Sequence, residues 1–441
     1  MNTHPIATIE SVDQEGRGVA RIEGKTTFVD GALPGEVAHV KLRRRKPTFD
    51  QGDVDQLLVE SAERVRPQCK HFGVCGGCSH QHQHWLAQVA VKQRVLEDCL
   101  ERIGKVRAET MLPPLFGVPW GYRHRARLSV KYVPKKGGVL VGFHERRSSF
   151  IADMTSCEVL PPHMSALLVP LRHLVEKLSI RDKLPQIELA IGDAVEKPVT
   201  ALVLRILDPL TPEDEALLRD FADLHSVQFY LQTKGPETAA PFYPIENTLA
   251  YGLPEYGVTF RYKPTEFTQV NPHINARLVK KALTLLAAQP GERVADMFCG
   301  LGNFSLPIAT CGAIVVGVEG SEGLVERAWQ AAEENGLRAQ CDFKVSNLFE
   351  ATPESIAALG KLDRMVIDPP REGALEVCKS LPLASAPEAL KRIVYVSCNP
   401  ATLARDAEVL VSERGYRIVS AGIANMFPHT SHTESMAVFE P

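Results

Sequence analysis

Residues 293–309 read RVADMFCGLGNFSLPIA, which joins a short apolar run, a glycine turn and the start of a helix. Gly300 and Gly302 allow the backbone to turn tightly and to approach a ligand, while the free N–H groups of the helix N-terminus point at that ligand. The next apolar run, AIVVGVE, ends in Glu319, whose carboxylate can accept both hydroxyls of a ribose. The stretch therefore predicts a nucleotide-type site between a strand and a helix.

Two details distinguish between the cofactors that such a site binds. Ser305 replaces the third glycine of the dinucleotide fingerprint, and Asp296 precedes the turn, where a carboxylate can meet the amino group of an amino acid moiety. Asn347, after a third apolar run, suits an adenine edge, and Asp368 ends a fourth run. These features favour S-adenosylmethionine over NAD. A plain glycine turn with no ligand is the competing interpretation.

From residue 265 to residue 441, short apolar runs alternate with helical sequence. This alternation predicts a Rossmann-like α/β domain with a doubly wound parallel sheet, whose ligands bind at the carboxyl edge of the strands. The runs are RVADMFC, AIVVGVE, DFKVS, DRMVID and RIVYVSC, followed by YRIVSAGIANM and ESMAVFE.

The rest of the chain predicts two further domains. Residues 1–62 hold short alternating runs separated by Gly, Pro and Asp, which is typical of a small β-barrel of the OB type. Residues 63–264 mix strands and helices as an α+β central domain. A chain of 441 residues, with 44% apolar and 23% charged residues, is consistent with such a multidomain globular protein.

The N-terminal sequence has no apolar core of signal-peptide length, and no apolar run approaches the ~20 residues that span a bilayer. We therefore expect a soluble cytoplasmic protein with no membrane partner, and a monomer by default. The net charge of −3 does not indicate a nucleic-acid partner, but the distribution of charge does. The run KLRRRK at 41–46 and the eight Lys or Arg against one acid in 121–147 lie in separate predicted domains. Each run alone is compatible with a solvated face, whereas two together favour a polyanion.

Cys69, Cys75 and Cys78 lie within the segment CKHFGVCGGC at 69–78. In a reducing compartment, clustered cysteines are more often metal-binding or catalytic than bridged. The segment therefore predicts a metal site that lacks one ligand. Zinc commonly binds C-x-x-C pairs, and iron–sulfur clusters bind four thiolates. The wide first spacing is less usual for zinc.

Cys398, in VYVSCNPATLARD, follows a predicted strand and precedes a predicted helix. A thiol at this position is expected to be partly exposed, with its pKa lowered by the helix N-terminus; a buried structural cysteine is the alternative. Beside a methyl donor, a thiolate can add to carbon 6 of a pyrimidine, so that carbon 5 becomes able to attack the methyl group. A base must then remove the proton of carbon 5. Glu434, in FPHTSHTESMAVFE, is the candidate, and His429 and His432 are expected to form a hydrogen-bonding loop.

The segments VSCNPATLARD, DPPREG, DMFCGLGNFSLP, FTQVNPHIN and HTSHTES resemble those of the RNA uracil-C5-methyltransferases, and they span residues 265–441. The upstream half resembles one branch of this family, which methylates a uracil in 23S ribosomal RNA. Its N-terminal unit is similar to a TRAM domain, and CKHFGVCGGCSHQ is similar to the iron–sulfur loop of that branch.

The resemblance implies roles for particular residues. Cys398 matches the nucleophile and Glu434 the general base. In that branch three close cysteines and one distant cysteine ligate a [4Fe–4S] cluster, which makes Cys157 the fourth ligand here; Cys99 is the rival, but it lies within a predicted helix. The implied S-adenosylmethionine contacts are Gln269, Phe298, Asn303, Glu319, Asn347 and Asp368.

The implied substrate is a single-stranded or loop segment of 23S ribosomal RNA, with the target uracil flipped out of its stack. Three alternatives remain at this point. The first is an iron–sulfur redox or radical enzyme, which requires the cluster near the cofactor. The second is an RNA-binding protein without activity. The third is the same chemistry on another ribosomal or transfer RNA uracil.

Overall fold

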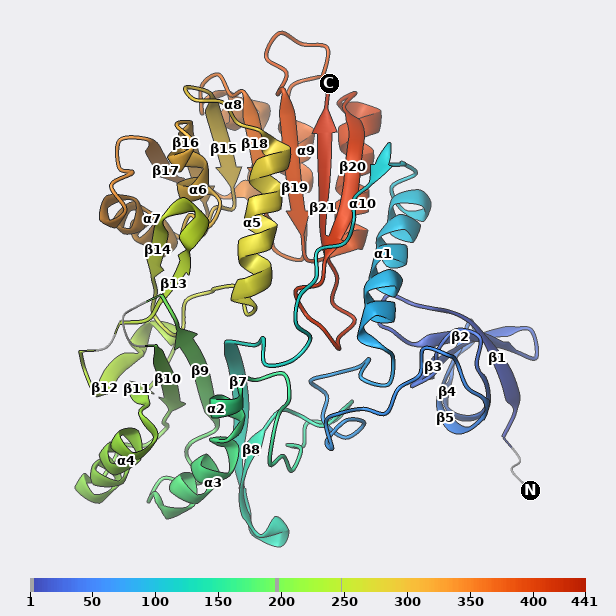
Figure 1. Ribbon diagram of the computed structural model, residues 1–441, viewed down its shortest axis with the longest axis vertical. Coiled ribbons are helices and arrows are strands. Elements are labelled where there is room, and N and C mark those ends of the chain that lie inside the picture. The colour runs from blue at the N-terminus through green and yellow to red at the C-terminus, as the bar shows by residue number, and fades with distance from the viewer. Residues whose placement is uncertain (1–3, 195–197, 247) are drawn as a thin grey trace.

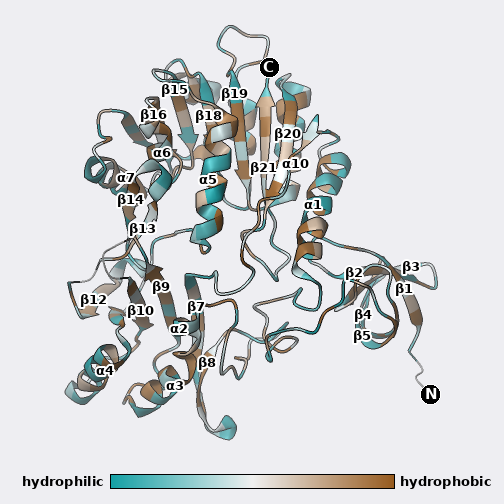
Figure 2. Ribbon diagram, viewed as in Figure 1, coloured by the Kyte–Doolittle hydropathy of each residue, from teal (hydrophilic) through white to brown (hydrophobic). Residues whose placement is uncertain are grey.

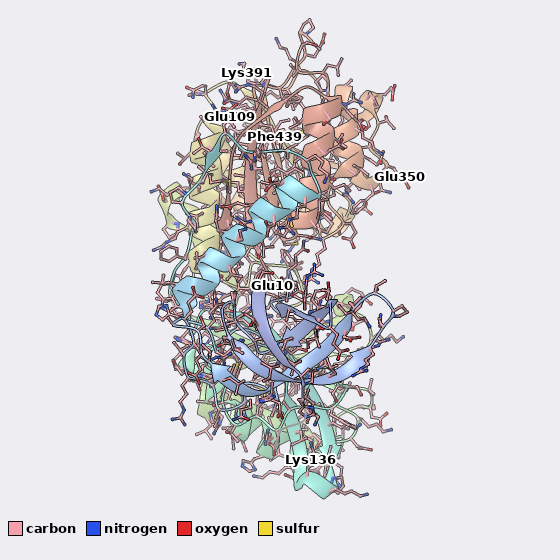
Figure 3. The ribbon with its side chains drawn as sticks, turned by 90° about the vertical axis from the view of Figure 1, so that its right-hand side faces the viewer. Glu10, Glu109, Lys136, Glu350, Lys391 and Phe439 are labelled. Atoms are coloured by element: carbon pink, nitrogen blue, oxygen red, sulfur yellow. The ribbon has the colours of Figure 1, made fainter. Side chains whose placement is uncertain are left out.

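The structure is a computed structural model that describes residues 4–194, 198–246 and 248–441 (Figure 1). It contains a small barrel, a central sheet with helices on one side, and a large sheet covered by helices on both faces. The predicted fold class is confirmed in all three parts. In Figure 3, Lys136 and Lys391 mark opposite ends of the molecule, with the barrel beside its middle.

The N-terminal barrel closes because its first strand pairs with both the second and the fourth. Apolar side chains alternate along these strands and fill the interior, with Ile9, Ala20 and Val29 fully enclosed. The strands are β1 (Ile6–Val12), β2 (Gly18–Ile22), β3 (Lys25–Asp30), β4 (Val37–Arg45) and β5 (Asp50–Val59).

The central sheet has the strand order β12-β11-β10-β9-β7-β8. Its helices are α2 (Pro162–Ser165), α3 (Leu168–Lys177) and α4 (Pro212–His225). Its strands are β7 (Arg125–Val133), β8 (Gly138–Gly142), β9 (Gln186–Gly192), β10 (Val199–Arg205), β11 (Gln228–Gln232) and β12 (Ala240–Tyr243).

The large sheet has the order β17-β16-β15-β18-β19-β21-β20-β6, in which the first five strands are parallel. β21 runs antiparallel between β19 and β20, so the sheet is mixed at this side. The strands are β15 (Arg293–Met297), β16 (Ile314–Glu319), β17 (Cys341–Val345), β18 (Arg364–Ile367), β19 (Arg392–Ser397), β20 (Arg417–Ala424), β21 (Glu434–Glu440) and β6 (Thr110–Met111).

Helices cover both faces of the large sheet. The strands are mostly hydrophobic, and the outer sides of the helices are hydrophilic (Figure 2). One face carries α5 (Pro272–Leu286), α6 (Ser305–Thr310) and α7 (Glu322–Glu334). The other carries α1 (Trp85–Arg102), α8 (Pro353–Ala357), α9 (Leu375–Ser380) and α10 (Pro400–Glu408).

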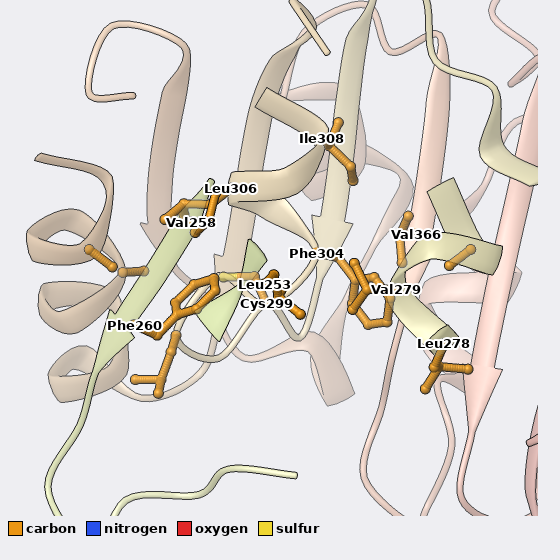
Figure 4. Close-up of a cluster of buried hydrophobic side chains, with 14 of the residues drawn as sticks. Leu253, Val258, Phe260, Leu278, Val279, Cys299, Phe304, Leu306, Ile308 and Val366 are labelled. Atoms are coloured by element: carbon orange, nitrogen blue, oxygen red, sulfur yellow. The ribbon is translucent and has the colours of Figure 1, made fainter. Parts of the chain in front are cut away.

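Two segments from the predicted central range, 63–264, pack on the large sheet instead. Leu96 and Leu100 of α1 are buried with the side chains of α10, and β6 pairs with the outer strand β20. The hairpin of β13 (Ala250–Leu253) and β14 (Val258–Arg261) contacts α7, and its Phe260 is buried in the core on the face of the sheet that carries α5, α6 and α7 (Figure 4). The sequence does not reveal these contacts because the apolar stripe of a helix does not indicate which surface will cover it.

Candidate active site

A cavity with a volume of about 840 Å³ lies at the carboxyl edge of the large sheet and extends to the central domain. The twelve residues expected to act as nucleophile, base, cofactor contacts or metal ligands all line it. These residues are Cys69, Cys75, Cys78, Cys157, Gln269, Phe298, Asn303, Glu319, Asn347, Asp368, Cys398 and Glu434. A cavity of this size can enclose a cofactor together with one base.

The register of two strands brings the predicted nucleophile and base together. β19 and β21 are antiparallel, with Ser397 paired to Ser435 and a bond of 3.0 Å from the Ser435 hydroxyl to the Ser397 carbonyl. One step further along this ladder, Cys398 stands opposite Glu434. Asp368 follows the end of the neighbouring strand β18 and borders the same space.

Burial controls the protonation of these groups. It raises the pKa of Glu434 to about 8, with a further contribution from the charge of Asp368. It raises the pKa of Asp368 to about 7, with a contribution from Asp296. The pKa of Cys398 is raised to about 11 by burial and by the charges of Glu434 and Asp368, and Arg371 opposes this only partly. The expected lowering of the Cys398 pKa by a helix N-terminus is therefore wrong.

The glycine turn has the left-handed backbone that its two glycines permit. Gly300 and Gly302 have φ values of 55° and 89°, and Phe298, which has a side chain, has 64°. The Glu319 carboxylate accepts bonds from the N–H groups of Gly300 at 3.2 Å and Ser321 at 3.0 Å. It is thus fixed at the end of β16, beside the turn, where a ribose is expected.

The amide side chains of the site are held by local bonds. Asn303 exchanges two hydrogen bonds of 3.0 Å with Asn275 of α5, and Asn347 accepts a bond of 3.2 Å from the N–H of Phe349. Asp296 does not line the cavity: it is fully buried and accepts a bond of 2.5 Å from the Ser305 hydroxyl. The interpretation that Asp296 meets the amino group of a ligand is therefore not supported, and Ser305 serves to bind this carboxylate.

The four cysteines predicted as metal ligands converge on the central-domain side of the cavity. Cys69, Cys75 and Cys157 are buried, and the ten cysteines of the chain form no disulfide. The Cys75 sulfur accepts a bond of 3.4 Å from the N–H of Gly77, as a thiolate ligand would. Cys99, the rival ligand, is buried in α1, and its sulfur accepts a bond from Gln14 of the barrel at 3.0 Å.

Sequence reasoning missed several residues of the cavity wall. Phe349 lies near Phe298, with ring centroids 5.7 Å apart, and Phe267 is exposed at the margin. Arg371 contacts His432 at 3.4 Å. Phe267 lies in FTQVNPHIN and Arg371 lies in DPPREG. Both segments were recognised as similar to those of the family, but neither residue was singled out as part of the site.

Two known families match the chain. Residues 7–54 match "TRAM domain", and residues 148–346 and 358–440 match "tRNA (Uracil-5-)-methyltransferase". The "23S rRNA (uracil(1939)-C(5))-methyltransferase RlmD" of Cupriavidus pinatubonensis is 60% identical over 99% of this chain and 95% of its own length. The protein of the same name from Dechloromonas aromatica is 59% identical over 99% of both chains.

The chain belongs to the RNA uracil-C5-methyltransferase family. Among solved structures, it is similar to the Pyrococcus abyssi tRNA (uracil-54, C5)-methyltransferase in complex with S-adenosyl-L-homocysteine, with a TM-score of 0.73 and 25% identity over 99% of this chain and all of that one. The likeness covers all three parts of the fold. The strands whose carboxyl ends border the cavity lie within the residues that match the methyltransferase family.

Proposed function

We propose that this protein transfers a methyl group from S-adenosylmethionine to carbon 5 of uracil 1939 in 23S ribosomal RNA, the reaction named for its curated relatives. The observation that carries the chemistry is the placement of Cys398 opposite Glu434 within one cavity. The same proposal describes a cytoplasmic monomer, and the ten free cysteines suit a reducing compartment. Within the described ranges, no helix has the length and apolarity that crossing a membrane requires.

The reaction consists of four balanced steps. After its thiol has lost its proton to solvent, Cys398 adds as a thiolate to carbon 6 of the uracil, which makes an enolate. Carbon 5 attacks the methyl carbon, and S-adenosylhomocysteine leaves with the electron pair of the broken carbon–sulfur bond. Glu434 takes the proton of carbon 5, and the thiolate then leaves carbon 6 as the ring double bond returns. No electron is gained or lost overall, so the reaction needs no reductant.

The cofactor is proposed to lie along the glycine turn. Gln269 reaches the methionine end, Glu319 the ribose and Asn347 the adenine, while Asp368 lies between the cofactor and the target base. Phe298 and Asn303 complete the contacts. The positions of these residues around one cavity support this assignment. The target uracil must leave its stack to enter the cavity, which costs least in single-stranded or loop RNA.

We further propose that Cys69, Cys75, Cys78 and Cys157 hold a [4Fe–4S] cluster, which would cross-link the loop at 69–78 to the central domain. Four thiolates are the donor set that such a cluster uses, and Cys75, Cys78 and Cys157 lie in or against the apolar core of the central domain. Among the residues that the structure describes, no three His, Cys, Asp or Glu side chains are arranged to hold one metal ion. The support for the cluster is therefore the donor set itself, four cysteines that line one end of the cavity.

Cys157→Ala is expected to lower the iron and acid-labile sulfide bound per chain by at least about half, since one of four ligands is removed. The midpoint of thermal unfolding should fall by roughly 5 °C or more, because the cross-link from a distant loop disappears. Iron analysis and calorimetry measure both. The exposed Cys311→Ala is the matched control. An unchanged iron content would remove Cys157 from the ligand set.

The redox alternative retains one point of support, since the cysteines border the same cavity as the cofactor residues. Turnover distinguishes the two. Methylation at the same rate with the oxidised and with the reduced cluster supports a structural role. A rate that follows the oxidation state of the cluster favours the redox enzyme.

The basic run of the barrel is only partly free to bind RNA. Arg43 is paired with Asp30 at 3.0 Å and Asp53 at 2.5 Å, and Arg147 of the central domain binds the same two carboxylates. This network ties the barrel to the central domain. Arg44 and Arg45 are exposed on β4 and remain the better phosphate ligands.

Charge reversal of Arg44 and Arg45 to Glu is expected to weaken RNA binding and to lower the slope of log affinity against log salt by ~0.7 for each phosphate that the variant no longer neutralises. Titrations of RNA at several salt concentrations measure this slope. Arg43→Glu should instead reduce stability, because it leaves Asp30 and Asp53 with less compensation. The control is Lys361→Glu, because Lys361 is exposed and precedes β18, at the end of the large sheet away from the cavity. A slope unchanged by the Arg44 and Arg45 reversals would exclude the barrel face as the phosphate-binding surface.

Methyl transfer itself is tested with S-adenosylmethionine labelled in the methyl group. Label is expected in a 23S ribosomal RNA transcript at carbon 5 of uracil 1939, with none in transfer RNA. Nuclease digestion and mass spectrometry locate it. Label in transfer RNA alone would move the protein to the other substrate class of its family.

A further inference from the structure

The segment from 425 to 433 connects β20 to β21 and leads directly into Glu434. One side of this connection borders the cavity through Phe427, Thr430 and His432. Its first residue, Asn425, is fully buried. The connection therefore forms part of the cavity wall, and its position determines where the side chain of Glu434 lies.

Side chains of helix α1 form hydrogen bonds with the connection 425–433. Lys92 donates from Nζ to the Asn425 side-chain oxygen at 2.7 Å and to the Phe427 carbonyl at 2.8 Å. One turn earlier, Gln88 accepts a bond of 2.9 Å from the N–H of His429. Lys92 and Gln88 lie on one face of α1, and only 3% and 1% of their surfaces are exposed.

Gln88 also reaches the cysteine-rich segment. Its side-chain N–H group donates to the carbonyls of His80 and Gln83, both at 2.9 Å. The N–H groups of Ser79 and His80 in turn donate to the His429 carbonyl at 2.9 and 3.0 Å. Gln88 thus joins the catalytic connection to the segment that follows the cluster cysteines.

Neighbouring elements hold the remaining positions. The hydroxyl of Tyr122 donates to the Pro428 carbonyl at 3.0 Å, and the Trp120 ring stacks on His429 with centroids 3.8 Å apart. His429 has a φ of 65°, which a residue with a side chain adopts at a cost. A backbone in this conformation persists when its surroundings fix it.

A buried lysine without a carboxylate partner is costly. Lys92 makes no ion pair in the described parts of the chain, burial lowers the pKa of its amino group to about 7, and its Nζ donates to two acceptors of the same connection. An apolar side chain of equal length would fill the space without this cost. The two bonds are therefore what the lysine contributes at this position.

We propose that Lys92 and Gln88 are positioning residues, which hold the connection 425–433 so that Glu434 reaches the proton of carbon 5. This inference rests on the proposed function. Neither side chain lines the cavity, so both act through the connection and not on the substrate. The step that they control is proton removal and release of the thiolate, because the methyl donor and Cys398 are held by other elements.

The test compares Lys92→Met with the wild-type chain on ordinary uracil RNA and S-adenosylmethionine. Displacement of a general base by about 1 Å is expected to slow release of the thiolate by roughly 10- to 100-fold. The methylated covalent complex should therefore persist on denaturing gels with ordinary uracil, while the KM for S-adenosylmethionine stays within about twofold. Gln88→Leu should act in the same direction. Arg94→Met, on the exposed side of α1, is the matched control.

Three results would overturn the inference. They are release of product at the wild-type rate, equal loss of adduct formation and product release, and a raised KM for S-adenosylmethionine with no persistent complex. If Lys92→Met does not fold, Lys92→Gln retains one donor and is judged by the same results. Failure of the wild-type chain to form any adduct on RNA containing 5-fluorouracil would instead contradict the proposed function.

Discussion

Cys398→Ala is expected to abolish methyl transfer, by at least about 10⁴-fold, because no other group can activate carbon 5. The clearest measurement uses RNA containing 5-fluorouracil. Fluorine cannot leave as a proton, so the wild-type chain should be trapped as a covalent methylated complex that survives denaturing electrophoresis. The complex should be absent from Cys398→Ala even at long incubation.

Two variants make this result specific to Cys398. The exposed Cys311→Ala should form the complex at the wild-type rate. Cys299 also lines the cavity, but it is buried and its pKa is raised well above the ordinary range by burial and by the charge of Asp296. Cys299→Ala should therefore still form the complex. A complex that disappears in Cys299→Ala and remains in Cys398→Ala would transfer the nucleophile to the glycine turn.

Glu434→Gln is expected to separate the two halves of the reaction. The methyl group should still be transferred, since Cys398 and the cofactor site are intact, but the proton of carbon 5 has no acceptor. Turnover should fall by about 10²- to 10⁴-fold, and a covalent complex should accumulate on ordinary uracil RNA. Rapid quenching followed by denaturing electrophoresis measures both rates. Equal loss of complex formation and turnover would show that Glu434 does not act after methyl transfer.

The pH dependence of complex release tests the same carboxyl group. Burial raises the pKa of Glu434 to about 8, so it is mostly protonated at neutral pH and must lose its proton to act as a base. The rate of release should therefore rise with pH, by about tenfold per unit below pH 8, and level off above it. Glu434→Gln should lack this rise. A rate that falls as pH increases would assign Glu434 the role of an acid.

The glycine turn, the strand ends and the cysteine segment were predictable because each is local. A strand followed by GLGNF, or a cysteine followed by NPAT, carries its meaning within a few residues. The pairing of Ser397 with Ser435 joins residues far apart in the chain, so the closeness of Cys398 and Glu434 was available only from the family resemblance.

Other features depend on contacts that no local pattern contains. Arg43 belongs to a basic run, yet two carboxylates occupy it. Lys92 has the appearance of a solvated helix residue, yet it is buried against residues more than three hundred positions later. The pKa of Cys398 is raised because burial and the charges of Glu434 and Asp368 outweigh the charge of Arg371. Such effects depend on desolvation, which the tertiary structure determines.

The insertion of β21 between β19 and β20 has a consequence for protein synthesis. Strand β20 cannot join the sheet until residues 434–440 have left the ribosome, because β21 links it to β19, and its other neighbour, β6, pairs with β20 alone. The barrel consists of residues 6–59 and can form much earlier. During translation, the barrel can therefore fold before β21, which carries the proposed general base Glu434, has joined the sheet.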